Sequence, residues 1–241
     1  MIDINKIYNE DCIVTMSKMV NDYVDITVTS PPYNTGGQNA QTGRNRKLYD
    51  NYKDNLSDDE YYDFIKTTIN ELLRVTKNYV FFNFQLLTKN KSTYLKIIGE
   101  YNKNIKDVFI WKKSLAIAQV VKGKLATGYE IVLILGKNNS MIYEHNNFPS
   151  NNYVPNIKSF KKEENFHKIN NATMPISMAE YFIHYFSKEN EIVYDPFMGI
   201  GTTACASVKQ NRNYIGSEIS LNYCELANKR IQSYVNQLTI F

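Results

Sequence analysis

The stretch that decides the fold reads Asp195-Pro-Phe-Met-Gly-Ile-Gly-Thr-Thr-Ala204. An apolar run of strand length precedes it, and the residues from Thr202 onward have the composition of a helix. The next strand-like run ends at the acidic residue Glu218. A glycine-rich turn between a strand and a helix, with an acid at the end of the following strand, is typical of parallel α/β sheets that bind a ligand at their carboxyl edge. We therefore expect an α/β fold with its binding site at this turn.

Strand-like and helix-like patterns alternate along most of the chain, which predicts a doubly wound, mostly parallel α/β sheet of the Rossmann-like kind. The clearest helix begins with the capping box Ser57-Asp-Asp-Glu60 and continues with apolar residues at helical spacing. The expected strands are 25–29, 78–84, 107–111, 130–135, 191–195 and 214–218. The further expected helices are 86–101, 175–187, with Pro175 in its first turn, 202–209 and 220 onward.

The chain has 241 residues, of which 28 are Lys or Arg, 24 are Asp or Glu, and 43% are hydrophobic. These values exclude a disordered chain, and the length fits one large domain or two small ones. We expect a single domain over residues 1–241. No apolar run approaches the roughly 18 residues of a membrane span, and the N-terminus does not resemble a signal peptide, so we expect a cytoplasmic protein. Cys12, Cys205 and Cys224 show no metal-ligand spacing, and we expect reduced thiols and no metal site.

Two classes of cofactor fit the glycine-rich turn, and the charge beside the turn separates them. A nicotinamide dinucleotide places its pyrophosphate at the helix N-terminus, where the carboxylate of Asp195 would repel it. S-adenosylmethionine instead brings a sulfonium and an ammonium group, and both suit Asp195. The pair Pro196-Phe197 before the glycines also departs from a dinucleotide turn. We therefore favour S-adenosylmethionine and keep an NAD-dependent oxidoreductase as the alternative.

A second motif, Thr29-Ser-Pro-Pro-Tyr-Asn34, leaves the end of an earlier expected strand. Its two prolines have a fixed φ and no N–H group, so the turn keeps its shape and its backbone carbonyls have few competing donors. Ser30 offers a hydroxyl acceptor, Pro31 a carbonyl acceptor and Tyr33 a flat aromatic face. Together these groups can hold a planar ring that carries an amino group, such as a base flipped out of a nucleic acid.

The two motifs together resemble those of the DNA amino-methyltransferases, which modify N4 of cytosine or N6 of adenine. That family has (Asp/Asn/Ser)-Pro-Pro-(Tyr/Phe/Trp) for catalysis, which is Ser30–Tyr33 here, and Phe-x-Gly-x-Gly for the cofactor, which is Phe197–Gly201 here. The order is similar to that of the group whose catalytic motif comes first, and the resemblance spans nearly the whole chain. It implies a methyltransferase of Rossmann-like fold that uses S-adenosylmethionine and acts on double-stranded DNA.

The resemblance also implies roles for the residues of the catalytic motif. Ser30 and the carbonyl of Pro31 would accept the hydrogens of the target amine. Tyr33 would stack on the flipped base, and Pro32 completes the motif.

For the cofactor, the resemblance places Glu218 on the ribose hydroxyls and Asp11 at the adenine amine. The glycine-rich turn would line the methionine end, and the stretch 172–175 would close over the cofactor. The full set of expected cofactor contacts is Asp11, Ala172, Thr173, Pro175, Asp195, Phe197, Gly199, Gly201, Thr202 and Glu218.

The serine at the head of the catalytic motif favours cytosine as the target. Val28-Thr-Ser-Pro-Pro-Tyr33 resembles the cytosine-N4 form of the motif, whereas adenine-N6 enzymes more often begin it with Asp. Because some adenine enzymes also begin it with Ser, N6-adenine methylation stays open as the alternative. A non-catalytic nucleic-acid-binding module is a more distant alternative, as is the oxidoreductase.

Basic and aromatic residues follow the catalytic motif in a polar stretch, 34–56, which we expect to be a mobile loop. Arg44, Arg46 and Lys47 are predicted to contact DNA phosphates there, and a solvated loop is the competing interpretation because acidic residues follow. The irregular segment 137–171 is rich in Asn and Lys and is predicted to be an inserted target-recognition segment. The other expected partners are a separately encoded restriction endonuclease and a second copy of the chain in a homodimer.

Overall fold

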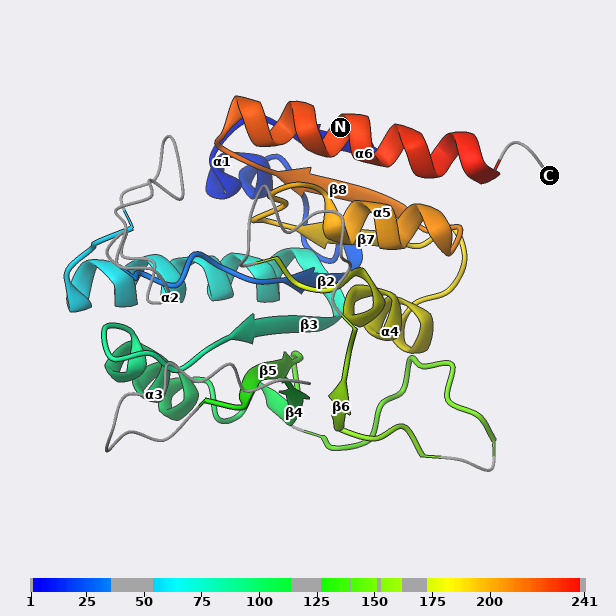
Figure 1. The fold of residues 1–241 in the computed structure, drawn as a ribbon. Helices are drawn as coiled ribbons and strands as arrows, with labels where there is room; N and C mark the ends of the chain where they lie inside the picture. The colour runs from blue at the N-terminus through cyan, green and yellow to red at the C-terminus, as the bar shows by residue number, and fades with distance from the viewer. Residues whose placement is uncertain are drawn as a thin grey trace.

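The structure, a computed structural model, describes residues 2–35, 54–113, 127–138, 140–150, 153–161 and 173–238. In these residues eight strands form one sheet with the order β1-β8-β7-β2-β3-β5-β4-β6, and helices cover both of its faces (Figure 1). The strands are β1 Lys6–Tyr8, β2 Val24–Thr29, β3 Thr76–Phe84, β4 Ile105–Lys112, β5 Tyr129–Leu135, β6 Ile157–Ser159, β7 Ile192–Asp195 and β8 Asn213–Ser217. The helices are α1 Cys12–Ser17, α2 Asp58–Val75, α3 Lys91–Glu100, α4 Ile176–Phe186, α5 Thr202–Lys209 and α6 Leu221–Leu238.

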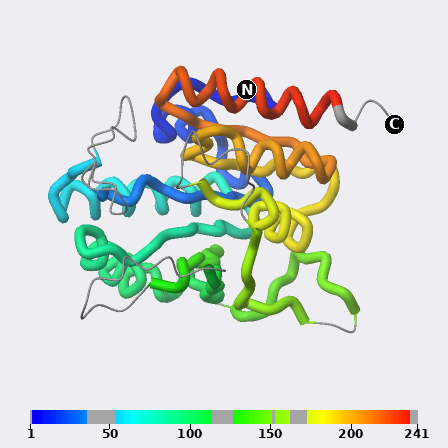
Figure 2. Tube along the Cα trace, in the orientation of Figure 1, coloured from blue at the N-terminus to red at the C-terminus, as the bar shows by residue number. Residues whose placement is uncertain are grey.

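Seven of the eight described strands run in one direction, and the eighth, β5, runs in the opposite direction. It is antiparallel to both of its neighbours, β3 and β4, whereas the other neighbouring pairs are parallel. Because β1 adds to the sheet beside β8, the N-terminal strand lies next to the C-terminal helix α6 (Figure 2). The predicted doubly wound, mostly parallel α/β sheet is therefore confirmed.

Strand β3 shows how the sheet separates two hydrophobic cores. Its successive side chains point to opposite faces, as they do in any strand. Tyr79 and Phe81 join the core formed with α4, α5 and α6, while Val80 and Phe82 join the core formed with α1, α2 and α3. All four side chains are at most 6% exposed. A strand buried on both faces reads as a continuous apolar run, which is why this segment is easy to predict.

Helix α2 begins where the sequence predicts it. The hydroxyl of Ser57 accepts a hydrogen bond from the N–H of Glu60 at 3.3 Å, and the carboxylate of Glu60 accepts one from the N–H of Ser57 at 2.8 Å. This reciprocal capping box satisfies two of the N–H groups that a helix start leaves unpaired.

Some short elements and helix starts differ from the sequence prediction. β1, α1 and β6 have 3, 6 and 3 residues and were not predicted, because so few residues show no periodic pattern. α3 begins at Lys91 and not at Leu86, since the side chain of Asn90 accepts the N–H of Leu87 at 2.7 Å and holds the preceding residues in a turn. Pro175 is the N-cap of α4 and not part of its first turn.

The described parts of the segment 137–171 pack partly against the sheet. Phe160 is 5% exposed in the core formed with α4. Asn147 donates hydrogen bonds to the carbonyls of His184 and Ser187 at the end of α4. The recognition role of this segment and the single domain stay predictions. Within the described ranges, no helix is long and apolar enough to cross a membrane.

Candidate active site

Both sequence motifs leave the carboxyl ends of neighbouring strands. β2 and β7 pair in parallel, with Ile26 opposite Val193 and Thr27 opposite Tyr194. The catalytic turn after β2 and the glycine-rich turn after β7 therefore meet at the edge of the sheet where α/β proteins bind ligands. The two turns line one cavity of about 260 Å³. The predicted site residues that line it are Asp11, Ser30, Pro31, Pro32, Tyr33, Thr173, Asp195, Phe197, Gly199, Thr202 and Glu218.

Two predicted cofactor residues, Pro175 and Gly201, do not line this cavity, and the structure gives each a packing role. Pro175 is buried at the start of α4. Gly201 is the N-cap of α5 with a φ of 81°, and a Cβ atom there would lie 3.0 Å from the Cβ of Ala227 in α6. Glycine thus permits both the left-handed turn and the close approach of α5 to α6. The predicted residues Ala172, Arg44, Arg46 and Lys47 lie outside the described residues.

Asp195 ends β7 and is 4% exposed. Its oxygens accept hydrogen bonds from the hydroxyls of Thr29 and Thr203, both at 2.7 Å, and from the N–H of Phe197 at 3.0 Å. Burial raises the pKa of this carboxyl to about 6, although the hydrogen bonds favour its charged form. In the described part of the chain, Asp195 forms no ion pair with Lys or Arg. The cavity wall therefore holds a desolvated carboxylate that can attract a cationic ligand.

Glu218 follows β8 and keeps the glycine-rich turn in shape. Its two oxygens accept hydrogen bonds from the N–H groups of Gly199 and Ser220, each at 2.8 Å. Gly199 has a φ of 54°, a left-handed conformation that glycine adopts without strain. Burial raises the pKa of Glu218 as well. Each carboxylate oxygen has two lone pairs, so Glu218 can still accept hydrogen bonds from the hydroxyls of a ligand.

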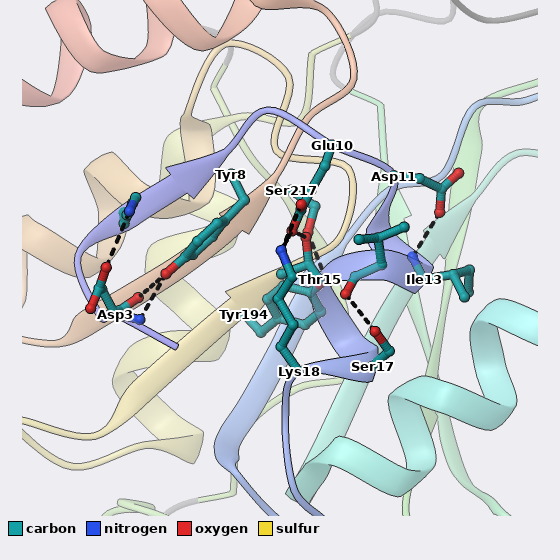
Figure 3. Close-up of polar contacts among 12 residues, drawn as sticks. Asp3, Tyr8, Glu10, Asp11, Ile13, Thr15, Ser17, Lys18, Tyr194 and Ser217 are labelled. Atoms are coloured by element: carbon teal, nitrogen blue, oxygen red, sulfur yellow. Dashed lines mark hydrogen bonds and ion pairs between the residues drawn. The ribbon is translucent and has the colours of Figure 1, made fainter. Parts of the chain in front are cut away.

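Asp11 brings the N-terminal helix to the same cavity. One of its carboxylate oxygens accepts the N–H of Ile13 at 2.7 Å, which makes Asp11 the N-cap of α1 (Figure 3). In the same region, the hydroxyls of Tyr194 and Ser217 lie 2.8 Å apart and link β7 to β8 (Figure 3). The cap fixes the direction of the Asp11 side chain at the cavity wall.

Several apolar residues of the cavity wall were not predicted. The ring of Phe64, in α2, lies 5.7 Å from that of Phe197, measured between centroids. Tyr223 was not predicted either, whereas Met174 and Met198 line the cavity from within the predicted stretch 172–175 and the glycine-rich turn. The amphipathic pattern of α2 indicates only that Phe64 faces the protein, so the sequence does not separate it from the ordinary core.

The catalytic turn is held by side chains from other parts of the chain. Tyr61 donates a hydrogen bond to the carbonyl of Pro32 at 2.7 Å, and Asn90 donates one to the carbonyl of Tyr33 at 2.9 Å. Among the described residues, no donor contacts the carbonyl of Pro31. The turn is therefore shaped before any ligand binds, and Pro31 keeps an acceptor for one.

A polar cluster next to Ser30 and Tyr33 was not predicted either. The hydroxyl oxygens of Ser30 and Tyr33 lie 2.9 Å apart, and Tyr33 donates to the carboxylate of Glu130 at 3.0 Å. Asn83 donates to Tyr33 at 2.9 Å and to Glu130 at 2.8 Å. The same amide nitrogen lies 3.3 Å from Ser30 Oγ, and Lys113 forms an ion pair with Glu130. Because these residues come from four separate segments, no single stretch of sequence contains the pattern.

Comparisons with known proteins agree with this geometry. A model of the N6/N4 DNA methylase family matches residues 24–229. A 64-residue stretch is 50% identical to the orphan methyltransferase M.BamHII of Bacillus amyloliquefaciens, and it covers 27% of this chain and 24% of that protein. Over 100% of both chains, the identity to the type II methyltransferase M1.MboII of Moraxella bovis is 25%. The chain thus spans about a quarter of the first relative and the whole of the second.

A solved structure gives the same fold. The PvuII DNA methyltransferase, described as cytosine-N4-specific, superposes with a TM-score of 0.70 at 16% identity, over 96% of this chain and 91% of that chain. The family match confirms the enzyme class that the two motifs predict, and with it the methyl donor. The chain belongs to the N6/N4 family of DNA methylases, which are enzymes that use S-adenosylmethionine.

Proposed function

We propose that this chain transfers a methyl group from S-adenosylmethionine to the exocyclic amine of a base flipped out of double-stranded DNA, with N4 of cytosine as the favoured target. One observation carries the proposal. The acceptors of the catalytic turn, Ser30 and Pro31, line the same cavity as the carboxylate of Asp195. Two hydrogen-bond acceptors for an amine and a carboxylate that can attract a cation therefore lie in one site.

The charges of the cofactor complement the carboxylates of the cavity. The cationic methionine end supplies the opposite charge that a buried carboxylate such as Asp195 needs. Glu218 accepts hydrogen bonds from the ribose hydroxyls, and Asp11 accepts one from the adenine amine. Phe64 and Phe197 provide apolar walls. When bound, the cofactor supplies an electrophilic methyl group.

The catalytic turn holds the target amine. Ser30 and the carbonyl of Pro31 each accept one amine hydrogen, which favours a pyramidal nitrogen with its lone pair free to react. Tyr33 stacks on the base and fixes the plane of the ring. Methyl transfer needs alignment more than it needs a strong base, so positioning of this kind supplies much of the rate. The proton of the amine leaves to water after the transfer.

The preference for cytosine rests on Ser30, which stands at the first position of the catalytic motif. The name of the PvuII enzyme, cytosine-N4-specific, supports the same choice. N6 of adenine is the second candidate, because the matching family includes enzymes of both kinds.

We propose that the segment between Asn34 and Leu56 contacts DNA. Its two ends are joined, since the side chain of Asn34 donates to the carbonyl of Leu56 at 2.9 Å and accepts the N–H of Leu56 at 2.8 Å. We propose phosphate contacts from Arg44, Arg46 and Lys47, which lie between these ends. Charge reversal at Arg44 and Arg46 is expected to weaken DNA binding at low salt. Unchanged binding would support the competing interpretation, in which this stretch is a solvated loop without DNA contacts. The recognition segment 137–171, a companion endonuclease and a homodimer stay predictions.

The test of the methyl transfer uses cofactor labelled in its methyl group and duplex DNA of varied sequence, which is then digested to nucleosides. Label is expected in N4-methylcytosine, and label in N6-methyladenine would establish the second candidate. The control is Ser30→Ala, which is expected to bind the cofactor and transfer no label. Cofactor binding without any label in DNA would refute the proposal.

A further inference from the structure

The polar cluster beside the catalytic turn, Asn83, Lys113 and Glu130, has no part in the transfer described above. We propose that Glu130 sets the direction of the hydrogen bonds around Ser30, so that the Ser30 hydroxyl can only accept a hydrogen bond from the base. Glu130 is then a positioning residue that makes the site prefer a base with an amino group over one with a carbonyl group. This inference rests on the proposed function, and it adds how the target group is recognised.

The first step concerns the charge of Glu130, which is 7% exposed. The ammonium group of Lys113 contacts Oε1 of this carboxylate and lies 3.5 Å from the ring centroid of Trp111. Lys113 thus supplies the opposite charge that a buried carboxylate needs. An ionised carboxylate has no hydrogen to donate, so Oε2 of Glu130 can only accept hydrogen bonds.

The second step follows the hydrogens from Glu130 to Ser30. Tyr33 has one hydroxyl hydrogen and uses it for Oε2 of Glu130, at 3.0 Å. In the 2.9 Å contact between the hydroxyls of Ser30 and Tyr33, Ser30 must therefore be the donor. Ser30 then has no hydrogen left, and only oxygen lone pairs remain for a ligand in the cavity.

The hydrogen bonds of Asn83 support the same direction of donation. The amide nitrogen of Asn83 lies 2.9 Å from the hydroxyl of Tyr33, 2.8 Å from Oε2 of Glu130 and 3.3 Å from Oγ of Ser30, and these three acceptors share its two hydrogens. Its amide oxygen is buried and has no hydrogen-bond partner in the part of the chain that the structure describes. The reversed amide would place that oxygen against the carboxylate of Glu130, so Glu130 also fixes the orientation of Asn83.

The consequence is a preference for an amino group at the target position. The amines of cytosine and adenine present hydrogens, which the lone pairs of Ser30 can accept. The carbonyls of uracil and hypoxanthine, the deaminated counterparts, present lone pairs that face those of Ser30. A site that is built to hydrogen-bond one group discriminates strongly against a partner that leaves its polar groups unpaired.

The test is the substitution Glu130→Gln, which keeps the shape of the side chain and adds donor hydrogens. The new amide can donate to Tyr33, Tyr33 can then donate to Ser30, and the hydroxyl hydrogen of Ser30 can turn toward the cavity. Binding is measured with S-adenosylhomocysteine present, to one duplex that contains the target base and one that contains its deaminated counterpart. Wild type is expected to favour the amino base about tenfold or more, and Glu130→Gln to bind the two duplexes about equally.

The ratio of the two affinities is the informative quantity. The ease of flipping each base is a property of the duplex, so it cancels when the ratios of the two proteins are compared. The matched control is Glu100→Gln. Glu100 also accepts from a tyrosine hydroxyl, that of Tyr62, and pairs with Lys66, but it does not line the cavity. Its variant is expected to keep the wild-type ratio.

A second variant, Tyr33→Phe, removes the hydroxyl that relays the direction and keeps the ring. Tyr33→Phe is also expected to lower the ratio of the affinities for the amino and the deaminated duplex. This variant therefore tests the inference if Glu130→Gln does not fold. An unchanged ratio in a folded Glu130→Gln protein that binds the cofactor would overturn the inference. Equal weakening for both duplexes would show a structural role and also overturn it. Failure of the proposed function looks different, because wild type itself would then transfer no methyl group to DNA.

Discussion

The two turns that meet at the cavity are built in different ways. The cofactor turn belongs to one β-α-β unit, and the partners of its carboxylates, Asp195 and Glu218, lie within that unit apart from the hydroxyl of Thr29 at the end of β2 and the backbone around Ser220. The catalytic turn depends on side chains from distant segments, among them Tyr61, Asn83 and Asn90. A local motif thus makes the cofactor site, whereas tertiary packing makes the catalytic geometry. Changes beside the catalytic turn should therefore affect methylation without affecting cofactor binding.

Ser30→Ala is expected to show the largest difference between the effect on the methylation rate and the effect on cofactor affinity. This variant should lose about 100-fold or more in the rate of methylation, because it removes one of the two acceptors that position the amine. Its affinity for S-adenosylmethionine should equal that of wild type. Single-turnover methylation and calorimetric titration measure the two properties. The control Ser17→Ala changes an exposed serine of α1 and should alter neither. A parallel loss of cofactor affinity in Ser30→Ala would break the comparison.

Asp195→Asn tests whether the negative charge of the cofactor turn contributes to the binding of S-adenosylmethionine. Removing the carboxylate should weaken S-adenosylmethionine binding about tenfold or more, since a charge-assisted contact is lost. Because burial raises the pKa of Asp195 to about 6, the wild-type affinity should also fall as the pH drops through that value and the carboxylate takes up a proton. The affinity of the variant should show no such step. Titrations of both proteins between pH 5 and 8 decide this, and matching pH profiles would contradict the assignment.

The same substitution should stabilise the protein without cofactor by about 1–3 kcal/mol at neutral pH. The folded state holds its proton up to about pH 6, whereas the ordinary carboxyl releases it near 3.8, so wild type loses stability as the pH rises between these values. An asparagine side chain can still accept from Thr29 and Phe197, and it carries no charge. Thermal unfolding across this pH range measures the effect. A variant with a lower melting temperature than wild type at pH 7 would contradict it.

A smaller effect distinguishes the two glycines of the cofactor turn. Gly201→Ala should cost about 1–3 kcal/mol of stability, because the new Cβ would lie 3.0 Å from that of Ala227 and the φ is 81°. Gly199→Ala should cost only about 1 kcal/mol, since its nearest neighbour would be the carbonyl of Phe197 at 3.9 Å. Chemical denaturation gives both values. Equal losses would mean that backbone conformation, and not the contact with α6, sets the cost at Gly201.

The smallest effect is expected for Tyr61→Phe, which removes the hydrogen bond to the carbonyl of Pro32. The loss should be about 1 kcal/mol of stability with a few-fold slower methylation and unchanged cofactor affinity. The neighbouring variant Tyr62→Phe alters an exposed hydroxyl that contacts Glu100, and it should methylate DNA at the wild-type rate. Equal rates for all three proteins would show that the catalytic turn keeps its shape without Tyr61.

The sequence predicts what is encoded in contiguous patterns. The glycine-rich turn, its acid Glu218 and the catalytic motif can all be found because strand, turn and helix follow one another in the chain, and the sheet then brings their ends together. Asn83 and Glu130 could not be assigned in this way. Asn83 interrupts the apolar run of β3 and Glu130 is the one charged residue of β5, and their role arises only because β3 and β5 pair side by side. Phe64 was missed for the same reason, since a helical pattern does not tell a cavity wall from a core.

The pair of hydrogen bonds between Asn34 and Leu56 has a consequence for the length of chain between them. Asn34 directly follows the catalytic turn, so these two bonds hold the ends of the segment together next to that turn. Closing a flexible loop becomes only about 0.6 kcal/mol more costly with each doubling of its length. A longer or shorter segment between Asn34 and Leu56 would therefore change the free energy of folding only slightly.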